Sequence, residues 1–590
     1  RFYVGFDVPF GRFLNWLMGK EGEFKLFGIG IPRTVGPTIQ WGETQYGIGI
    51  LPLGGYVKMF GQDDNVANLA EERERSKALE GSPDAKKITG PDGEDLWVDR
   101  RSYLAKTVPQ RMAIISAGVV MNLIFAFVFA WIAFGYGVPQ TPATVGQTLA
   151  GAPAWVAGLR TGDRITELNG IADPTYKQLR EQVMLGDLEA GLPCTVERVD
   201  GSMVTLTLRP EVAGPAPRVG VLSASSLTLL DDAERFVGES TPAAGAGLKP
   251  GDYVAAVDGE PVASHAEMVA RLAELRAESV ELTVVRDGEA ASRDPLAKPA
   301  GGETLTVTVP PNRRERLGVV PTLGPVTTLE PGGPAAEAGL AEGDVLIAVD
   351  GVAIGAAPDG EPSVSPLRID ERLSAAARES RSVTLTARRG EESVELTVTP
   401  RVADWQTFAA DENAPLPLDA IGAACEVRAE VAAVVAGGPA EAAGVRVGDR
   451  IVSAELSSDE PADRLDAPLT LALGAGSRNW LGVEYAIQDR SAALRVQLAI
   501  ERPTAAGSEG AAERLSVTLT PDESPDAYTV DRGMAFAGLR TMRVGATLGE
   551  RASLAWQETR DALLTVVKVL QRLGGQVSVK AIGGPLTIAT

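Results

Sequence analysis

The sequence predicts a multidomain membrane protein. We expect a β-hairpin sheet, one transmembrane helix, four small α+β domains that are mainly β, and an amphipathic C-terminal helix. Three observations lead to this prediction: an uncharged apolar stretch at residues 112–138, one signature that occurs four times, and many turn-forming residues. The chain has 590 residues with 65 glycines, 39 prolines and 5% aromatics, which is typical of several domains built from short strands.

Charge and rare residues exclude several classes of protein. The net charge of −22 argues against nucleic acid as a partner. Cys194 and Cys425 show no ligand spacing, so we predict small buried residues and not a disulfide framework. His265 is the single histidine, which excludes a two-histidine metal motif or a second catalytic histidine within these residues. The chain starts at Arg1 and stops within an apolar run, so we expect a piece of a longer protein.

The first hundred residues divide into two parts. Residues 44–59 alternate between apolar and polar positions and then turn, which predicts a hairpin bent at residues 52–55. We assign residues 1–60 to this β-hairpin region and residues 61–100 to an acidic insertion or loop.

One segment is long and apolar enough to cross a bilayer. Residues 112–138 would form roughly 40 Å of helix at about 1.5 Å per residue, more than the ~30 Å of a hydrocarbon core. Basic residues precede it and the first one after it is Arg160, so residues 1–111 should be cytoplasmic or dip into the membrane, and the rest extracytoplasmic. Asn122 lies inside the span. Its amide should face protein or a polar cavity, and a hydrogen bond that only packs helices is an equally good interpretation.

The remainder repeats one signature, Pro-Ala-x-x-Ala-Gly-(Leu/Val)-x-x-Gly-Asp. Its copies occupy residues 153–163, 242–252, 334–344 and 439–449. The pattern predicts a helical turn closed by a glycine, then a turn into a strand. The predicted strands are residues 164–168, 253–257, 345–349 and 450–454, and an Asx-Gly turn follows the first three. Copies about 90 residues apart indicate separate small domains and not a solenoid.

These elements give the predicted boundaries of the domains. They are 101–138 for the transmembrane helix with its basic flank, 139–212, 213–310, 311–402 and 420–522 for the four repeats, and 523–590 for an amphipathic helix and the start of a next membrane segment. The helix, at residues 550–573, has charged residues between its apolar ones, so it should lie on the membrane surface or the protein and not span.

The repeats resemble PDZ domains in their bacterial arrangement, and the fourth is the most divergent. The resemblance implies binding of extended peptides, often C-termini, along a sheet edge. It also implies that Gly220-Val221 and Gly318-Val319, upstream of the second and third signatures, receive the peptide, although a plain first strand is as good an interpretation. His265 would open a helix that lines the groove, or be a solvated helix residue.

A second resemblance covers almost the whole chain. Three segments carry it: Leu-Pro-Leu-Gly-Gly-Tyr-Val-Lys-Met at 51–59, the Gln-Arg and Asn-containing helix at 110–126, and residues 556–589. Together with the repeats they resemble the RseP-type site-2 protease family, intramembrane zinc metalloproteases. The resemblance implies that Asn122 lies near the active site. It also implies that the hairpin region at residues 1–60 is a membrane-associated β-hairpin sheet whose edge pairs with the substrate strand; a hairpin that only packs on its neighbours is the alternative. The pairing residues would be Gly54, Gly55, Tyr56, Val57 and Lys58.

The family's His-Glu-x-x-His and Leu-Asp-Gly motifs are not in this sequence, so we expect no catalytic residue and no bound zinc here, and zinc in the full-length protein. The predicted function is the central part of an intramembrane zinc metalloendopeptidase whose PDZ array gates the access of transmembrane substrates. A membrane-anchored PDZ scaffold or an inactive protease relative is the alternative. The family implies the bacterial inner membrane, a multi-pass topology, and the lipid bilayer, transmembrane proteins and peptide C-termini as partners.

Overall fold

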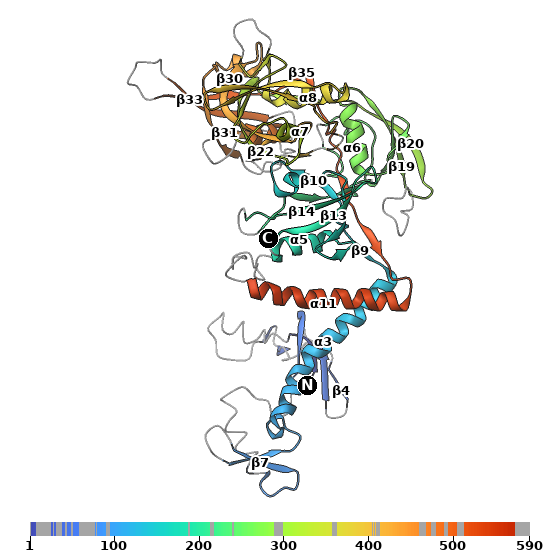
Figure 1. The fold of residues 1–590 in the computed structure, drawn as a ribbon. Coiled ribbons are helices and arrows are strands. Elements are labelled where there is room, and N and C mark those ends of the chain that lie inside the picture. The colour runs from blue at the N-terminus through green and yellow to red at the C-terminus, as the bar shows by residue number, and fades with distance from the viewer. Residues whose placement is uncertain are drawn as a thin grey trace. The chain divides into compact units, whose positions relative to one another are not determined.

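The computed structural model describes most of the chain. The described residues are 2–6, 25–26, 29–30, 38–41, 44–48, 51–57, 77, 79–89, 95–186, 189–212, 217–238, 241–287, 299–356, 363–403, 405, 407–408, 414–458, 468–473, 480–488, 494–503 and 512–572. They fall into two compact units, residues 1–129 and 130–590 (Figure 1).

The first unit contains a four-stranded sheet in the order β4-β5-β1-β6. The strands are β1 (Phe2–Phe6), β4 (Thr38–Trp41), β5 (Thr44–Ile48) and β6 (Leu51–Val57). The predicted hairpin over residues 44–59 is wrong, because β1 lies between β5 and β6, parallel to β5 and antiparallel to β6. Residues 52–55 therefore belong to a strand and not to a bend. Two further pairs are β2 (Lys25–Leu26) with β3 (Ile29–Gly30), and β7 (Ala85–Thr89) with β8 (Asp95–Asp99).

The predicted membrane helix is present as α3 (Val108–Tyr136), preceded by the short η2 (Tyr103–Ala105). Among the described residues it is the one helix long and apolar enough to cross a membrane. Most of its large apolar side chains are exposed, including Val119, Phe125 and Phe129. A water-exposed helix of this composition would be unfavourable, so this surface is suited to lipid.

All four repeats begin as predicted. The signature opens with a single helical turn in three repeats, at α4 (Pro153–Val156), α7 (Pro334–Glu337) and α9 (Pro439–Ala442), and with a hydrogen-bonded turn in the second. The strands that follow are β11 (Arg164–Leu168), β17 (Tyr253–Val257), β23 (Val345–Val349) and β31 (Arg450–Ser458). The first three match the predicted bounds residue for residue. Asn169, Asp258 and Asp350 have φ near +50°, as the predicted Asx-Gly turns require.

A return strand, a helix and a strand pair complete each repeat. The return strands are β12 (Ile171–Ala172), β18 (Glu260–Pro261), β24 (Val352–Ile354) with β25 (Ser363–Val364), and β32 (Leu469–Ala472). The helices are α5 (Tyr176–Leu185), α6 (His265–Glu274), α8 (Ile369–Arg378) after η3 (Pro366–Arg368), and α10 (Trp480–Gln488). The pairs are β13 (Leu192–Glu197) with β14 (Met203–Leu208), β19 (Val280–Arg286) with β20 (Glu303–Val309), β26 (Val383–Arg389) with β27 (Glu392–Val398), and β33 (Leu494–Arg502) with β34 (Glu513–Leu519).

The repeats are nested and do not follow one another as the predicted boundaries have it. The sheet of the second repeat ends in β36 (Phe536–Gly538), which pairs with β16 (Ser225–Leu229). The chain between these parts leaves along β21 (Asn312–Arg316) and returns along the antiparallel β35 (Asp522–Thr529). Residues 312–529, with the third and fourth repeats, are therefore an insertion in the second repeat.

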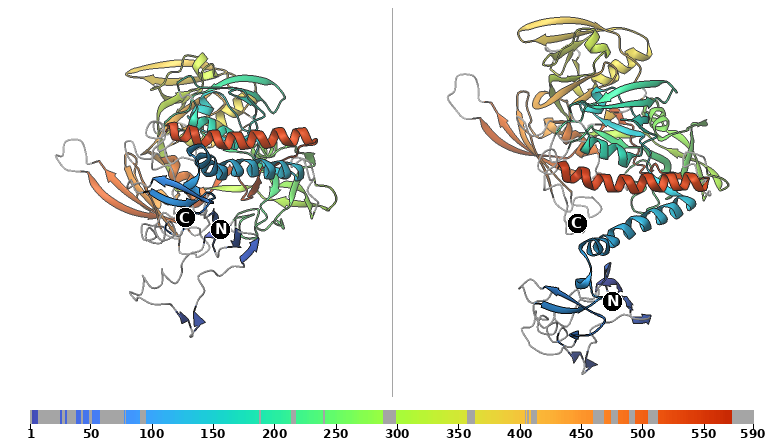
Figure 2. Two further views of the ribbon diagram at one scale, coloured as in Figure 1. Left: turned by 90° about the horizontal axis from the view of Figure 1, so that it is seen from below. Right: turned by 60° about the horizontal axis from the view of Figure 1, so that its bottom comes forward.

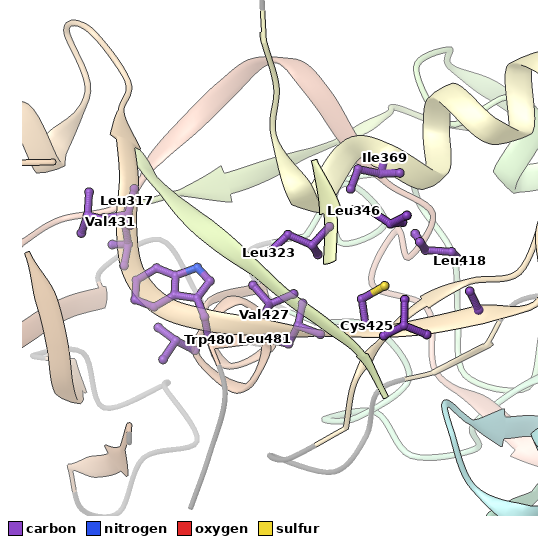
Figure 3. Packing of buried hydrophobic residues seen from close by; sticks show 14 of the residues in the cluster. Leu317, Leu323, Leu346, Ile369, Leu418, Cys425, Val427, Val431, Trp480 and Leu481 are labelled. Atoms are coloured by element: carbon purple, nitrogen blue, oxygen red, sulfur yellow. The ribbon is translucent and has the colours of Figure 1, made fainter. Parts of the chain in front are cut away.

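The third and fourth repeats share two long strands and one core. β22 (Val319–Leu329) and β30 (Ala423–Val434) pair antiparallel with several register shifts, so each strand runs from one repeat into the other. Buried residues of both repeats form a single cluster, in which Leu346 and Ile369 of the third are continuous with Trp480 of the fourth (Figure 3). The first and second repeats have separate cores.

The chain after the repeats returns to the first repeat. β37 (Thr541–Arg543) pairs with β9 (Val138–Gln140), and the predicted amphipathic helix is present as α11 (Leu548–Arg572). α11, the long red helix in Figure 2, contacts α5, and Lys177 Nζ is 3.1 Å from Glu558 Oε1. Trp131 Nε1 also donates to the carbonyl oxygen of Leu548 at 3.3 Å.

Candidate functional site

The signature aspartate closes each repeat through a buried ion pair. In the second repeat Arg286 Nη2 donates to Asp252 at 2.7 Å and to the carbonyl oxygen of Gly247 at 2.9 Å. The equivalent pairs are Asp163–Arg198, Asp344–Arg389 and Asp449–Arg502, and each arginine also binds the signature glycine. A charge-assisted pair of this kind fixes the Gly-Asp turn against the end of a later strand. The signature therefore specifies structure and not catalytic chemistry.

The pair is not electrostatically identical in all repeats. Burial raises the pKa of Asp163 to about 6, in spite of its hydrogen bonds from the amide of Arg160 and from Arg198. The hydrogen bond from Arg389 instead holds the pKa of Asp344 below its ordinary value. At neutral pH the carboxylate is thus stabilised by its environment in the third repeat and destabilised in the first.

A glycine loop completes each signature. In the order of the repeats the loops are residues 218–221, 531–534, 420–423 and 316–319. The glycine of each loop has a φ between +68° and +87°, a region that favours glycine. The residue before this glycine accepts a hydrogen bond from the amide of the second signature residue, as Val219 does from Ala154 at 2.8 Å. The other three pairs are Ala243 with Arg532, Ala335 with Ile421, and Ala440 with Leu317.

These contacts place the predicted loop residues with other partners than expected. Gly220-Val221 lies against the first signature and not the second, and Gly318-Val319 lies against the fourth and not the third. The loops of the second and third repeats, at Gly533 and Gly422, were missed. A glycine between apolar residues was the available signal for Ile421-Gly422-Ala423, whereas Gly533 follows the charged Arg532 and carries no such signal.

The loops differ in what their amides bind. In the first repeat the N–H groups of Val219 and Gly220 are buried and donate to no residue that the structure describes. Within the same limits, this also holds for Leu317 and Gly318 in the fourth repeat. Buried amides without an acceptor are rare in folded proteins and often mark a ligand site.

The other two loops have acceptors. In the third repeat the amides of Ile421 and Gly422 both donate to the carbonyl oxygen of Leu418. In the second, the amide of Gly533 donates to Asp531 Oδ1 at 2.7 Å.

We use the term loop site for a glycine loop together with the strand that follows it and the helix opposite. In the first repeat β15 (Val221–Ser223) is the terminal strand of its described sheet, and Tyr176 Oη of α5 donates to the carbonyl oxygen of Val221 at 2.8 Å. In the second, β36 is terminal and His265 of α6 packs edge-on against Phe536, with ring centroids 4.9 Å apart. Burial lowers the pKa of His265 to about 4, so this imidazole is neutral at pH 7. His265 is thus an apolar contact of its loop site and not a solvated helix residue.

A cavity of about 640 Å³ lies where the first repeat meets the end of α3 and α11. Its apolar lining includes Phe134, Met184 and Leu554, and its polar lining includes Arg180 and Arg543. The cavity therefore opens next to the point where the chain leaves the apolar helix.

The predicted site residues of the first unit that the structure describes belong to α3 and to β6. Asn122 lies in α3 with an exposed side chain. Gly54, Gly55, Tyr56 and Val57 lie in β6, which is a terminal strand among the described strands of its sheet. Lys58 lies outside the described residues. An edge strand has unpaired backbone groups, so its position is compatible with the predicted pairing with a substrate.

An apolar helix followed by four β-rich repeats describes a membrane protein with an array of small domains. Residues 19–590 match the model of peptidase family M50, so the chain belongs to this family. Relatives named regulator of sigma-E protease and zinc metalloprotease agree with the predicted RseP-type site-2 protease family.

Three relatives illustrate the similarity. The chain is 27% identical over 292 residues to the regulator of sigma-E protease RseP of Salmonella typhimurium, which covers 48% of this chain and 58% of that protein. It is 26% identical over 338 residues to a putative zinc metalloprotease of Vibrio cholerae, covering 53% and 68%. It is 32% identical over 205 residues to metalloprotease MmpA of Caulobacter vibrioides, covering 33% and 48%. The chain thus spans 58% of the length of the first of these relatives.

One of these relatives is named a putative zinc metalloprotease, but the described residues of this chain contain no zinc-binding site. They contain no group of three or more histidine, cysteine, aspartate or glutamate side chains arranged to hold a metal. Burial raises the pKa of Cys194 to about 11 and that of Cys425 to about 12, so both remain neutral thiols. These residues do not fit a zinc ion, and no zinc ligand is assigned to them.

Proposed function

We propose that the chain is the central part of an intramembrane zinc metalloendopeptidase that cuts transmembrane substrates. Membership of peptidase family M50 and the exposed apolar surface of α3 support this proposal. The zinc and the residues that activate water would come from His-Glu-x-x-His and Leu-Asp-Gly motifs outside this sequence. In the whole protein Asn122 would lie near that centre, and the edge of β6 at residues 54–58 would pair with the unwound substrate.

The four repeats are proposed to be extracytoplasmic PDZ domains. An extended peptide would add as a strand beside β15 or the 319–323 part of β22, with its terminal carboxylate on the loop amides of Val219 and Gly220 or of Leu317 and Gly318. The buried amides without acceptors support this assignment, because a carboxylate is a good partner for two convergent N–H groups. Peptide binding is thus assigned first to the first and fourth repeats.

The array is proposed to act as a size filter. Residues 130–590 form one compact unit, and its first repeat and α11 lie beside the end of the apolar helix. A folded extracytoplasmic domain on a substrate would be excluded until another protease has trimmed it. We place the protein in the bacterial inner membrane, with several spans in its full length and the repeats outside the cytoplasm.

The nested topology defines a clean test of the filter. Asn312 and Thr529 are paired neighbours at the two ends of the insertion, so residues 312–529 can be replaced by a short Gly-Ser linker without cutting the second repeat. In the full-length protein this deletion is expected to permit cleavage of substrates that keep their folded extracytoplasmic domain. The parent protein should cut only trimmed substrates. Continued rejection of untrimmed substrates by the deletion variant would rule out the filter.

The alternative is a membrane-anchored PDZ scaffold or an inactive relative, which the lack of a metal-binding group among the described residues keeps open. Zinc content and cleavage of a model transmembrane substrate by the full-length, detergent-purified protein separate the two. About one zinc per chain with chelator-sensitive cleavage supports the protease. No zinc and no cleavage supports the scaffold, and Asn122 and β6 would then have packing roles.

A further inference from the structure

The loop site of the third repeat already contains a strand. β29 (Leu416–Leu418) pairs antiparallel with the start of β30, with Leu418 opposite Ala423 and Leu416 opposite Cys425. The other edge of β30 pairs with β22 over the same residues. Both edges of this strand are therefore occupied, whereas β15 and β36 are terminal strands in the described sheets of the first and second repeats.

β29 ends as a bound peptide would end. The carbonyl oxygen of Leu418 accepts hydrogen bonds from the amides of Ile421 at 3.1 Å and Gly422 at 3.0 Å. The corresponding two amides of the first and fourth loops have no described acceptor. This carbonyl group therefore occupies the position that a terminal carboxylate would take.

The side chain of Leu418 is also bound as a ligand side chain would be. It is fully buried, in one cluster with Leu346 and Ile369, and α8 contacts β29 (Figure 3). The segment at 414–418 reads Ala-Pro-Leu-Pro-Leu, and its two prolines favour an extended backbone, so little conformational entropy is lost when it adds to a sheet.

The first repeat holds this strand in place. Asp419 Oδ1 accepts hydrogen bonds from Trp155 Nε1 at 2.9 Å and from Thr407 Oγ1 at 2.8 Å. Trp155 belongs to α4 and follows Ala154, whose amide binds the carbonyl oxygen of Val219 in the first glycine loop. A continuous path of backbone and hydrogen bonds thus connects the loop of the first repeat with the loop of the third.

We propose that residues 416–418 are the resident ligand of the third repeat. They close its loop site against external peptides until the strand leaves and Asp419 separates from Trp155. The inference rests on the proposed peptide-binding function of the repeats. Its consequence is that peptide binding at the third repeat must loosen the contact between the third repeat and the first.

The test measures how many peptides the full-length protein binds. The probe is a fluorescein-labelled Ala-Pro-Leu-Pro-Leu with a free C-terminus, the sequence of residues 414–418. Leu418→Ser removes the buried side chain and should add one bound peptide per chain at peptide concentrations that fill the open loop sites but do not displace the strand of the parent. Leu396→Ser makes the same change elsewhere in the third repeat, at a residue only 8% exposed, and should add none. Protection of the Val383–Arg389 amides from hydrogen exchange would verify that both variants are folded.

A second variant does not depend on the stability of the first. Leu416→Cys places a thiol opposite the native Cys425 and leaves Leu418 intact. With the disulfide formed, saturating peptide should bind one fewer site than after reduction. Peptide binding that is equal in the parent and Leu418→Ser, and equal before and after reduction, would overturn the resident ligand and leave the other loop sites in place. Absence of peptide binding in every variant would instead overturn the proposed peptide-binding function, and this inference with it.

Discussion

The first and third repeats are built from the same parts and differ in what their glycine loops hold. Both have the signature, the Asp–Arg pair and a glycine with positive φ. In the first, two buried loop amides have no described acceptor, and in the third the same amides bind Leu418 of the chain itself. Under the proposed function, one unit would therefore receive a peptide strand in the first repeat, whereas in the third it holds a strand of the chain itself.

Several contacts hold the first and third repeats together. Trp405 lies under the guanidinium groups of Arg160, at 4.1 Å from the ring centroid, and of Arg401, at 5.1 Å. Arg401 also pairs with Glu330 of the third repeat, and β28 (Thr407–Phe408) pairs with β10 (Val145–Leu149) of the first. The described residues between 401 and 419 thus join the two repeats by stacking, ion pairing and strand pairing.

The largest difference is expected when the Asp–Arg pair of each repeat is broken. Arg389→Met leaves Asp344, 2% exposed, without its partner and should destabilise the third repeat more than the equivalent change destabilises the first. Arg198→Met should destabilise the first repeat by only about 1 kcal/mol at pH 7. The pKa of Asp163 is already raised to about 6, so protonating this carboxylate costs little free energy. Hydrogen exchange of β23 and β11 measures the two effects.

Lowering the pH should increase the difference in stability between the two arginine variants. The folded-state pKa of Asp163 is above its unfolded value, so stability from this group is lost as pH rises through about 6 and regained as pH falls. The folded-state pKa of Asp344 is lowered, so its contribution is lost only as pH falls below about 4. Equal destabilisation of both repeats by the two arginine variants at pH 5 and pH 7 would contradict the electrostatic difference between them.

The second prediction concerns Asp370, which lies on α8, the helix that contacts β29. Burial raises its pKa to about 7, aided by the nearby charge of Asp419 and opposed by Arg276 and by a hydrogen bond from the amide of Ala420. One of its carboxylate oxygens is buried without a partner among the described atoms. The folded state keeps a proton that the unfolded chain releases, so the third repeat should lose as much as about 3 kcal/mol of stability between pH 4 and pH 7.

Asp370→Asn removes this titration. The variant should be more stable than the parent at pH 8 and show little gain at pH 4, by thermal unfolding and by hydrogen exchange of β26. Asp526→Asn is the control, because the hydrogen bond from Arg368 lowers the pKa of this exposed carboxyl and its loss should not stabilise. A gain for Asp370→Asn that is the same at pH 4 and pH 8 would show that packing, and not ionisation, is responsible.

The elements of each repeat could be predicted because local sequence determines them. Tyr253–Val257 and Val345–Val349 follow a Gly-Asp turn and precede an Asx-Gly turn. Both turns favour Gly, Asn and Asp, because these residues tolerate a positive φ. The amphipathic helix at Leu548–Arg572 and the apolar helix at Val108–Tyr136 were likewise visible as periodicity and composition.

Pairings between distant residues could not be predicted. β16 pairs with β36 some three hundred residues later, and no local pattern indicates which strand completes a sheet. The same limit explains the two misplaced loops: Gly318 precedes the third signature in sequence but binds the fourth. In the first unit, β1 separates β5 from β6 for the same reason. Sequence patterns specify units, whereas nesting depends on contacts that only the folded chain reveals.

The third prediction compares the loop glycine of the first repeat with a turn glycine of the same repeat. Gly220 has a φ of +73°, and a Cβ there would lie 2.3 Å from the Cβ of Ala152. Gly220→Ala should therefore displace the Val219 and Gly220 amides and weaken peptide binding at the first repeat at least tenfold, about 1.4 kcal/mol. Gly170→Ala has similar strain, at φ +79°, but open space around its Cβ, and should leave binding unchanged. Equal loss in both variants would point to general instability of the repeat.

The smallest effect is expected where α5 of the first repeat contacts α11. Lys177 and Glu558 form an ion pair at 3.1 Å, but their side chains are 67% and 48% exposed, so water and salt screen the attraction. Lys177→Gln should increase hydrogen exchange along residues 548–565 only about twofold, as expected for roughly 0.5 kcal/mol. Arg180→Gln, one turn further along α5, is the control without an ion pair to α11 among the described residues. Added salt should abolish the difference between the two variants. A large, salt-independent effect of Lys177→Gln would instead mean that this contact anchors α11 to the first repeat as firmly as Asp419 anchors the third.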